Sequence, residues 1–528
     1  MFIRRTRGGS KQNPIYYLQL VQSYRDEQGR PRQKVLCTLG REDEIINSDL
    51  PEKLAKKFAA LKDTLIILDK NEEALGDTKL LGPILALEAV WKKLGLNKLL
   101  AKVQKEYEIR FDLNRAVKLM VLNRLVAPKS KLGIDRWKKK LYRDQFEKIE
   151  LWHLYRALDI LAENRNLLQR DLYERTLSLF KPEVKVVFYD LTTLYFESQQ
   201  EDELRRYGYS KENKTDCVQV VLGMVMSREG LPLGYELFEG NRFEGKTVKR
   251  MITKLKEEFA IEKIIFVGDK GILSRRTLEE IEAAGYEYIV AAKVSGLGKK
   301  YEKEIKDLEN YEELTEDVRY RELEVGGRRL VVCHSRKRAQ RDRRMREELL
   351  EKLRERIQDS KVVKPAYRRF LRMKGAKMEI DEGKVERQAS WDGYFGFFTN
   401  ARELEAAEVL AAYKELWQIE ESFRCMKSTL KIRPIYHWTR RRIEGHVMMS
   451  FLSFYVLRSM EKLLEGSGIH LSPQRLMEEL SEIRAVEIRA KQKTYHARTK
   501  IEGLRHKILR ALGVKIPPFI LKEISVVE

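Results

Sequence analysis

The sequence predicts an α/β protein of several domains, built around a mixed β-sheet that an inserted α+β domain interrupts. Three observations indicate this fold class. Two apolar runs, residues 185–189 and 263–268, each precede an aspartate and resemble strands buried on both faces. Strand-like and helix-like segments alternate around these runs. The length of 528 residues also exceeds that of one typical domain.

The N-terminal segment predicts a small β module. Apolar and polar residues alternate at 16–21 and again at 33–37, and the turn-forming residues 26–29 lie between them. We therefore expect a β-hairpin.

A helical region follows, from about residue 79 to 180. Its apolar residues recur with helical spacing, and Gly95, Pro128 and Gly133 separate several short helices. Basic residues cluster at 136–140. A bundle that grips DNA, with a helix-turn-helix unit, is one interpretation; an ordinary helical domain with a solvated face is the other.

The next part of the chain predicts three strands, a helix, a strand, a helix and a strand. The segments are 185–190, 218–225, 233–238, 246–259, 263–269, 274–284 and 286–292. This order is the one expected of a ribonuclease H-like sheet, and two of its strands are predicted to end in an acid, Asp190 and Asp269.

This pattern breaks between about residues 295 and 392, which predict an inserted domain. Its expected elements are a hairpin at 320–332 with Gly326 and Gly327 at the turn, a strongly basic helix at 336–358 and strands around 378–388. The basic helix could clamp DNA or shield a site. Core-type sequence resumes with a strand at 394–398 and one long helix at 401–430, and a basic tail from about 461 is expected to be helical.

The predicted organisation has six parts. They are 1–75, an N-terminal β-hairpin module; 76–182, a helical DNA-end-binding domain; 183–294, the first part of the core; 295–392, the inserted domain; 393–460, the second part of the core; and 461–528, a basic helical C-terminal region.

Composition favours a nucleic-acid partner. The chain has 104 Lys and Arg against 81 Asp and Glu, a formal charge of +23 that attracts a polyanion. A highly charged surface on a heat-tolerant enzyme is the alternative. Four dispersed cysteines predict neither a zinc site nor a disulfide framework and fit a reducing cytoplasm. The longest apolar run, 447–457, is too short to span a bilayer, so we expect a cytoplasmic, nucleoid-associated protein without a membrane segment.

Two candidate site residues follow from the predicted sheet. Asp190 and Asp269 come at the carboxyl ends of buried strands, where α/β sheets bind ligands, so both carboxylates could face one cation. An acid at a strand end also often caps the next turn. The pair together, in this strand order, favours the metal site.

A third acid, Glu420, is expected on the predicted helix at 401–430. Tyr413, Glu420 and Lys427 are spaced by seven positions and form one stripe beside an apolar face. The rival acid, Glu421, lies about 100° round the helix and is expected to face solvent. An exposed Glu–Lys surface is the alternative interpretation of the stripe.

Three carboxylates predict a magnesium or manganese site. Hard oxygen ligands suit Mg²⁺ or Mn²⁺ better than zinc, and two ions could assist an in-line phosphodiester displacement. The sequence has no Walker-type glycine-rich loop, so we expect no nucleotide cofactor.

Histidines and tryptophans offer weaker candidates. His446 precedes the buried helix and is interpreted as a packing or helix-terminal residue rather than a ligand. Core packing is also the default for Trp391, Trp417 and Trp438, with stacking on a displaced base as the alternative for an exposed ring.

The same residues resemble a known family. Residues 413–427, YKELWQIEESFRCMK, are similar to the Tyr–Arg–Glu–Lys signature of DDE transposases in the insertion-sequence-four-like superfamily. Further similar blocks, in the family's order, are 189–193, 208–211, 231–233, 240–241 and 267–271. The resemblance covers most of the span from 185 to 450.

This resemblance implies roles for individual residues. Asp190, Asp269 and Glu420 take the places of the catalytic triad, which is also the metal-binding set. Tyr413 and Lys427 take the places of DNA-contacting residues, and Lys211 is a further candidate. The signature arginine falls at Leu416, a departure from the family for which Arg424 is the candidate substitute.

The function that the resemblance implies is metal-dependent cleavage and strand transfer at the ends of an insertion sequence, with double-stranded DNA as partner and a homodimer holding the paired ends. Two alternatives stay open. One is a DNA-binding element remnant that has lost catalysis, and the other is a non-transposing nuclease of the same fold. Three intact acids oppose the first, and extended basic regions oppose the second.

Overall fold

The computed structural model describes residues 2–10, 14–26, 28–54, 75–142, 144–182, 186–208, 216–242, 244–259, 264–268, 274–358, 369–374, 377–490 and 493–525. Asp269 and Lys211 lie outside these residues. The chain forms two compact units. One comprises Met1–Asp77, Val486–Ala497 and Ile520–Glu528, and the other comprises Thr78–Ala485 and Arg498–Phe519.

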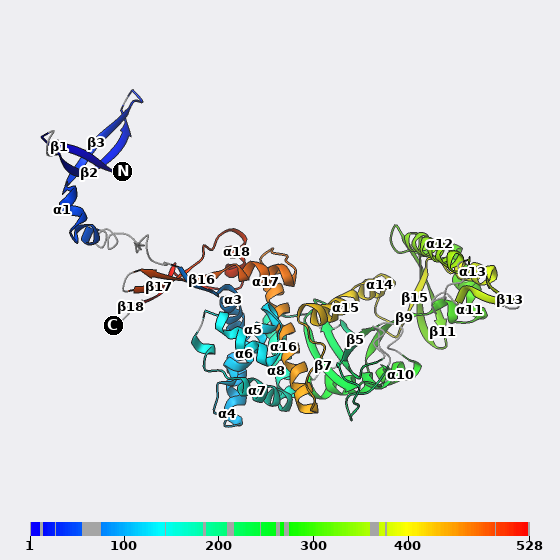
Figure 1. The fold of residues 1–528 in the computed structure, drawn as a ribbon. Helices are drawn as coiled ribbons and strands as arrows, with labels where there is room; N and C mark the ends of the chain where they lie inside the picture. Colours follow the sequence, from blue (N-terminus) through cyan, green and yellow to red (C-terminus); the bar gives the residue numbers. More distant parts are fainter. Residues whose placement is uncertain are drawn as a thin grey trace. The chain divides into compact units, whose positions relative to one another are not determined.

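The first unit contains the predicted hairpin as part of a three-stranded antiparallel sheet (Figure 1). Its elements are β1 (Phe2–Gly9), β2 (Pro14–Arg25), β3 (Pro31–Arg41) and the short helix α1 (Glu42–Ile46). The β2–β3 turn closes because an Asp26 carboxylate oxygen accepts hydrogen bonds from the backbone N–H groups of Gln28 and Arg30. The strand β1 was absent from the sequence prediction.

The second unit begins with the predicted helical region. Its helices are α3 (Gly82–Lys93), α4 (Leu96–Glu106), α5 (Leu113–Val126), α6 (Lys131–Trp137), α7 (Leu151–Glu163) and α8 (Arg165–Phe180). Asp112 and Ser130 cap α5 and α6 through side-chain oxygens, and Gly95 starts α4 with a positive φ of 64°. The breaks predicted at Gly95 and Pro128 therefore correspond to real helix boundaries, whereas the break predicted at Gly133 is wrong, because Gly133 lies within α6 and its N–H donates to the cap residue Ser130.

A nine-stranded mixed sheet forms the centre of this unit, in the order β10-β11-β12-β15-β9-β8-β5-β6-β7. Its middle part contains β5 (Val186–Tyr195), β6 (Gln219–Ser227), β7 (Pro232–Glu239), β8 (Ile265–Gly268) and β9 (Glu287–Ala292), with α9 (Glu244–Thr253) and α10 (Arg275–Ala283) between them in sequence. The strand β5 runs antiparallel to β6 and parallel to β8. The predicted succession of strands and helices is confirmed.

One face of the central sheet packs against α9 and α10. The odd-numbered β5 residues Val187, Tyr189 and Leu191 share a core with Met251 of α9 and Ile281 of α10. Since side chains alternate across a strand, the even-numbered residues face the opposite side of the sheet.

The segment predicted as an inserted domain continues the central sheet. It contains α11 (Lys299–Lys306), β10 (Glu312–Glu313), β11 (Val318–Val325), β12 (Arg328–Ser335), α12 (Arg336–Gln358), β13 (Leu371–Lys374), β14 (Lys377–Ile380) and α13 (Glu382–Ala389). The hairpin β11–β12 turns at Gly326 and Gly327, both with positive φ, and β12 pairs with β15 (Tyr394–Thr399). Strands were predicted around 378–388, but α13 occupies most of that range, because Asp381 caps a helix there.

The sequence predicted one continuous helix at 401–430, and this prediction is wrong. The structure has α14 (Ala406–Lys414), a break at Glu415 and Leu416, α15 (Trp417–Arg424) and a π-helical turn, η7 (Cys425–Thr429). Glu415, at the break, forms an ion pair with Arg228 of the β6–β7 turn, with nitrogen–oxygen distances of 2.7 and 3.0 Å. This ion pair connects the segment between α14 and α15 to the sheet.

The predicted buried helix is the centre of α16 (Arg440–Glu465), which contacts α5, α7 and β7 (Figure 1). A Cβ at Gly445 would lie 2.1 Å from the carbonyl oxygen of Leu158, so only glycine allows this approach to α7. No helix in the described residues is long and apolar enough to cross a membrane.

The tail is only partly helical, contrary to the prediction. It contains α17 (Pro473–Ser481), β16 (Arg484–Ala490), β17 (Lys493–Arg498), α18 (Gly503–Ala511) and β18 (Ile520–Ser525). Together with β4 (Leu75–Leu80), its strands form a sheet in the order β18-β17-β16-β4. The strand β16 lies beside β4, some 400 positions earlier in the sequence, while β17 pairs with β18, so tertiary pairing within this sheet accompanies the strand conformation of the tail.

Candidate functional site

Asp190 lies within β5, not at its end as the sequence predicted. Its neighbours from Val186 to Leu194 are buried, whereas Asp190 is only half-buried, and one of its carboxylate oxygens accepts the Leu191 N–H at 2.7 Å. Parallel pairing of β5 with β8 covers Val186 to Phe188, and Asp190 follows two residues later. The carboxylate therefore stands just beyond the described pairing with β8, on the sheet face opposite α9 and α10.

Glu420 comes to this sheet on α15, which packs on β5. The side chain of Glu420 is exposed, while that of Glu421 is half-buried. Glu421 lines a separate hollow with Arg458 and Glu461 and pairs with Arg424 at 3.8 Å. The expectation that Glu421 would be the more solvent-facing of the two is wrong, because residues of the helix at 440–465, among them Arg458 and Glu461, lie beside Glu421.

Glu420 lines a hollow of about 530 Å³, which we call the Glu420 hollow. Tyr413, Leu416 and Trp417 line it as well, so the break in the helix still brings Tyr413 and Glu420 together. The opposite wall includes Lys337, Arg338 and Arg341 from the first turns of α12. The hollow thus combines an acid with several cations, a composition suited to a phosphate-bearing ligand and a metal ion.

Two side chains hold the beginning of α12 at this hollow. Ser335 accepts the Arg338 N–H at 3.0 Å, and Asp317 accepts the Lys337 N–H at 2.9 Å. The Ser335 hydroxyl also donates to Asp317 at 2.6 Å. These hydrogen bonds, the one from Ser335 foremost, lower the pKa of Asp317 and keep it ionised. Arg338 packs its guanidinium over the Phe395 ring, 4.7 Å from the centroid.

The three cations of α12 were missed as individual site residues. The sequence showed a strongly basic helix, but its distance from Glu420 along the chain gave no signal that its first turns lie beside that acid. The pairing of β12 with β15 supplies the connection, because α12 follows β12 and Tyr413 packs on Phe397 of β15, with ring centroids 4.6 Å apart.

The other predicted DNA-binding residues lie elsewhere. Lys427 is on η7 and does not line the Glu420 hollow, and Arg424 is exposed on the side of Glu421. Arg424 therefore does not replace the missing arginine at Leu416 in that hollow.

Two tryptophans depart from the expected core packing. Trp417 and Trp438 are 58% and 60% exposed, whereas Trp391 is half-buried beneath the Lys306 ammonium, 4.6 Å from its ring centroid. His446 is buried, and its Nε2 lies 2.8 Å from the Ile432 carbonyl oxygen, as expected for a packing histidine.

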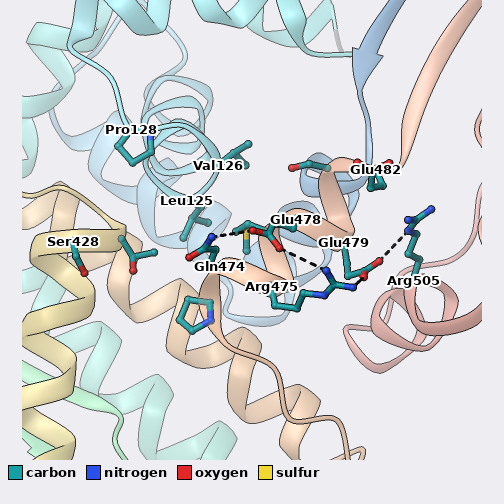
Figure 2. A pocket seen from close by; sticks show the side chains of 14 residues that line it. Leu125, Val126, Pro128, Ser428, Gln474, Arg475, Glu478, Glu479, Glu482 and Arg505 are labelled. Carbon is teal, nitrogen blue, oxygen red and sulfur yellow. Dashed lines mark hydrogen bonds and ion pairs between the residues drawn. The ribbon is translucent and has the colours of Figure 1, made fainter.

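A further hollow, of about 850 Å³, lies beside α17 and α18 (Figure 2). Figure 2 shows the carboxylate of Glu479 between Arg475 and Arg505, and Gln474 bonded to Glu478 at 3.0 Å. The charged groups of this hollow largely neutralise one another, and the ion pair between Glu479 and Arg505 links α17 to α18. The hollow therefore presents no net positive charge.

Comparison with known families gives two matches. The family "Transposase DDE domain" matches residues 182–456, more than half of the chain. The family "IS1634 family transposase, N-terminal domain" matches residues 3–64. A search of curated protein sequences gives no match.

Solved structures with similarity to this chain include three transposase complexes. A piggyBac transposase synaptic complex with hairpin DNA has 10% identity and a TM-score of 0.37, covering 77% of this chain and 82% of that one. A Mos1 mariner paired-end complex with Mn has 12% identity and a TM-score of 0.14, covering 34% and 58%. A Mos1 paired-end complex with the left transposon end has 13% identity and a TM-score of 0.15, covering 45% and 65%.

Proposed function

The chain belongs to the family of transposases with this DDE domain, and from that premise we propose that Asp190, Asp269 and Glu420 are its catalytic acids. The reaction is cleavage of DNA strands at the ends of an insertion sequence, followed by transfer of the freed 3′-hydroxyls to target DNA. The observation that carries the proposal is that the helix bearing Glu420 packs on the strand bearing Asp190.

We assign the central part of the sheet to a ribonuclease H-like core. Its order β9-β8-β5-β6-β7, with β5 antiparallel to β6 and parallel to β8, supports this assignment. Such a core places acidic residues from neighbouring strands on one sheet edge.

The strand register supports pairing Asp190 with Asp269. The described pairing of β5 with β8 ends with Phe188 opposite Val267, and the two aspartates each come two positions later in the sequence. Continuation of this register would bring the two carboxylates onto neighbouring strands at the same level.

The proposed acids suit Mg²⁺ or Mn²⁺, as two ions. The three carboxylates offer only oxygen donors, and hard divalent cations prefer oxygen donors. No three His, Cys, Asp or Glu side chains gather at one point among the described residues, a set that lacks Asp269. Bound ions would supply charge neutralisation for the attacking and departing oxygens. The chain's own part is to hold the three carboxylates close together and in fixed directions.

DNA is held by the cations and aromatic residues around Glu420. Arg338 and Arg341 are positioned to bind backbone phosphates, and Tyr413 contacts the same strand. Lys427 and Arg424 extend this contact outside the hollow, and Lys211, which lies outside the described residues, is a further proposed DNA contact. A homodimer would hold the two DNA ends in one complex.

The test uses supercoiled plasmid carrying the element's own ends with Mg²⁺. We expect Asp190→Ala, Asp269→Ala and Glu420→Ala each to abolish strand cleavage and leave end binding largely intact. Glu421→Ala is the matched control, since Glu421 lines a different hollow from that of Glu420. Cleavage retained by any of the three would refute the triad. Excised product, nicked circle or simple retardation would separate the transposase from a nuclease and from an inactive DNA-binding remnant.

A further inference from the structure

Another cavity, of about 960 Å³, lies between α5, α6, α7, the beginning of α16 and the loop before it. We call it the Trp438 cavity. Its volume falls within the range of about 300–1,000 Å³ in which proteins hold small ligands. Seven of its lining residues are Lys or Arg, and one is Asp. It shares no lining residue with the Glu420 hollow.

The positive charge in this cavity is incompletely neutralised. Its acid, Asp159, is held by Arg442 in a two-pronged ion pair with distances of 2.6 and 3.1 Å. Lys131 is 4% exposed and has no hydrogen bond or ion pair to any described residue. Arg124, equally buried, donates only to the carbonyl oxygens of Leu430 and Lys431. Burial and the Arg124 charge lower the Lys131 pKa to about 7, as expected for a buried cation that lacks an anion.

A buried hydrogen-bond acceptor also lacks a donor there. His446 Nε2 lies 2.8 Å from the carbonyl oxygen of Ile432, and a carbonyl only accepts, so Nε2 carries the proton. Burial and the nearby Arg124 and Lys131 keep the pKa of His446 well below its usual value, so the ring is neutral. Its Nδ1 therefore presents a lone pair, and this buried atom has no partner in the described structure. An N–H group of a ligand would satisfy it.

Two aromatic rings stand exposed at the same cavity. Tyr436 and Trp438 are 65% and 60% exposed, and the Arg205 guanidinium lies 5.2 Å from the centroid of the Trp438 ring. Exposed rings beside cations are the usual means of binding single-stranded nucleic acid, because every base has a face that can stack.

We propose that the Trp438 cavity binds an unpaired nucleotide of the DNA on which this chain acts. The phosphate lies by Lys131 and Arg124, the base stacks on Trp438, and an N–H of its free pairing edge donates to His446 Nδ1. A base inside a duplex has neither its face nor its pairing edge free, which favours an unpaired strand. This inference rests on the proposed function only for the identity of the nucleic acid.

The cavity is connected to the strand that bears Asp190. Ile435, in the loop that lines the cavity, pairs with Phe196 just beyond β5, and its N–H donates to the Tyr195 carbonyl at 3.2 Å. Phe196 comes six positions after Asp190, about 20 Å along the strand at roughly 3.3 Å per residue. The bound nucleotide therefore lies several positions from the bond that is cut.

The test measures binding by fluorescence anisotropy, with full-length protein, EDTA and a fluorescein-labelled single-stranded oligonucleotide. We expect Trp438→Ala to weaken single-strand binding about tenfold, the size of one lost stacking contact, and to leave duplex binding within about twofold. Lys131→Met should also weaken single-strand binding while keeping the fold, since it removes a buried cation without a described partner. Trp152→Ala, at another exposed tryptophan outside the cavity, is the control and should change neither.

Two further probes separate the possible ligands. Inorganic phosphate should compete only weakly, and an oligonucleotide of abasic sites should bind about as weakly to the wild type as the normal one binds to Trp438→Ala. Full competition by phosphate, or equal binding of abasic and normal strands, would show a phosphate site without a base and overturn the proposal. Unchanged single-strand affinity in folded Trp438→Ala and Lys131→Met would overturn it as well. Because no cleavage is measured, a failure of the catalytic triad would not affect this outcome.

Discussion

Arg341 differs from its neighbours on α12 in what its side chain can reach. It lines the Glu420 hollow, whereas Arg343 does not and pairs with Glu347 at 2.9 Å on the exposed face of the helix. We predict that Arg341→Ala weakens duplex DNA binding and lowers the slope of log affinity against log salt by about 0.9, the value for one phosphate contact. Arg343→Ala is the matched control. Equal losses in the two variants would mean that α12 binds DNA through its overall charge and not through the hollow.

Lys131 makes stability depend on pH in a predictable direction. Its pKa is about 7 in the folded protein and near the ordinary 10.5 when unfolded. Between these values the unfolded chain binds the proton and the folded one does not, so stability rises with pH through this window. Below about pH 7 both states are protonated, and the full cost of burying the charge remains.

We therefore predict that Lys131→Met is more stable than the wild type at pH 6, by on the order of a few kcal/mol, and that the difference shrinks towards pH 10. Urea denaturation of both proteins without DNA, over a series of pH values, measures it. The surrounding groups Arg124, His437, His446 and the Asp159–Arg442 pair are common to both proteins, and the Lys131 charge lowers the pKa of His437 and of His446, so the difference measures Lys131 together with its coupling to these two histidines. A difference independent of pH would contradict the assigned burial of the cation.

At the level of residues, sequence patterns located Tyr413 and Glu420 but not the groups opposite them. Spacing along one segment is visible in the sequence, and these two side chains do line one hollow. Arg338 and Arg341 reach the same hollow through sheet pairing between β12 and β15, a long-range contact that no local pattern encodes. The pairing of Asp190 with Asp269 stays a prediction, because Asp269 lies outside the described residues.

At the level of elements, the position of α15 depends on the ion pair that holds the break before it. Arg228 and Glu415 join the β6–β7 turn to this break, and Gly230 in the same turn leaves room for Gln418, whose Oε1 would lie 3.0 Å from an added Cβ. We predict that Arg228→Glu lowers strand cleavage several-fold, because two facing carboxylates repel and displace the helix that carries Glu420.

The reversed pair Arg228→Glu with Glu415→Arg serves as the rescue. It should recover most of the cleavage activity in the plasmid assay, since it restores opposite charges across the same gap. If the double variant is as impaired as Arg228→Glu alone, these side chains act separately, and the pair does not position α15.

The elements that sequence analysis predicted well are those with strong local signals. Continuous apolar runs predicted β5 and β8, and Gly326 with Gly327 predicted the β11–β12 turn. The break at Glu415 was missed because no glycine or proline marks it; in the structure Glu415 pairs with Arg228, a contact remote in sequence. The strand β16 was missed although it neighbours β4, which is remote in sequence, and β17 and β18 were missed although they pair with each other.

At the level of the whole molecule, the inserted segment is an extension of the core sheet. Since β12 pairs with β15 and β15 with β9, the sheet is continuous from β10 to β7. This continuity brings the basic helix α12 to the hollow of Glu420. The six-part division predicted from the sequence stays a prediction, because the structure separates only two compact units.

Charge and metal are expected to control separate steps of the reaction. In the proposed function, the +23 charge would act on DNA through phosphate contacts that release counterions, whereas the three proposed acids would act only on the bond that is cut. We predict that raising salt from 50 to 200 mM lowers duplex affinity by about 10³–10⁵-fold, as for 6–10 phosphate contacts.

EDTA at constant ionic strength should abolish cleavage and leave affinity within about twofold. Gel retardation and plasmid cleavage on the same samples measure both. A flat salt response would show that the positive surface is not used for DNA, and loss of binding in EDTA would show that metal ions, rather than residues such as Arg338 and Arg341, hold the strand. Either result would require a different division of labour between the basic surface and the carboxylates.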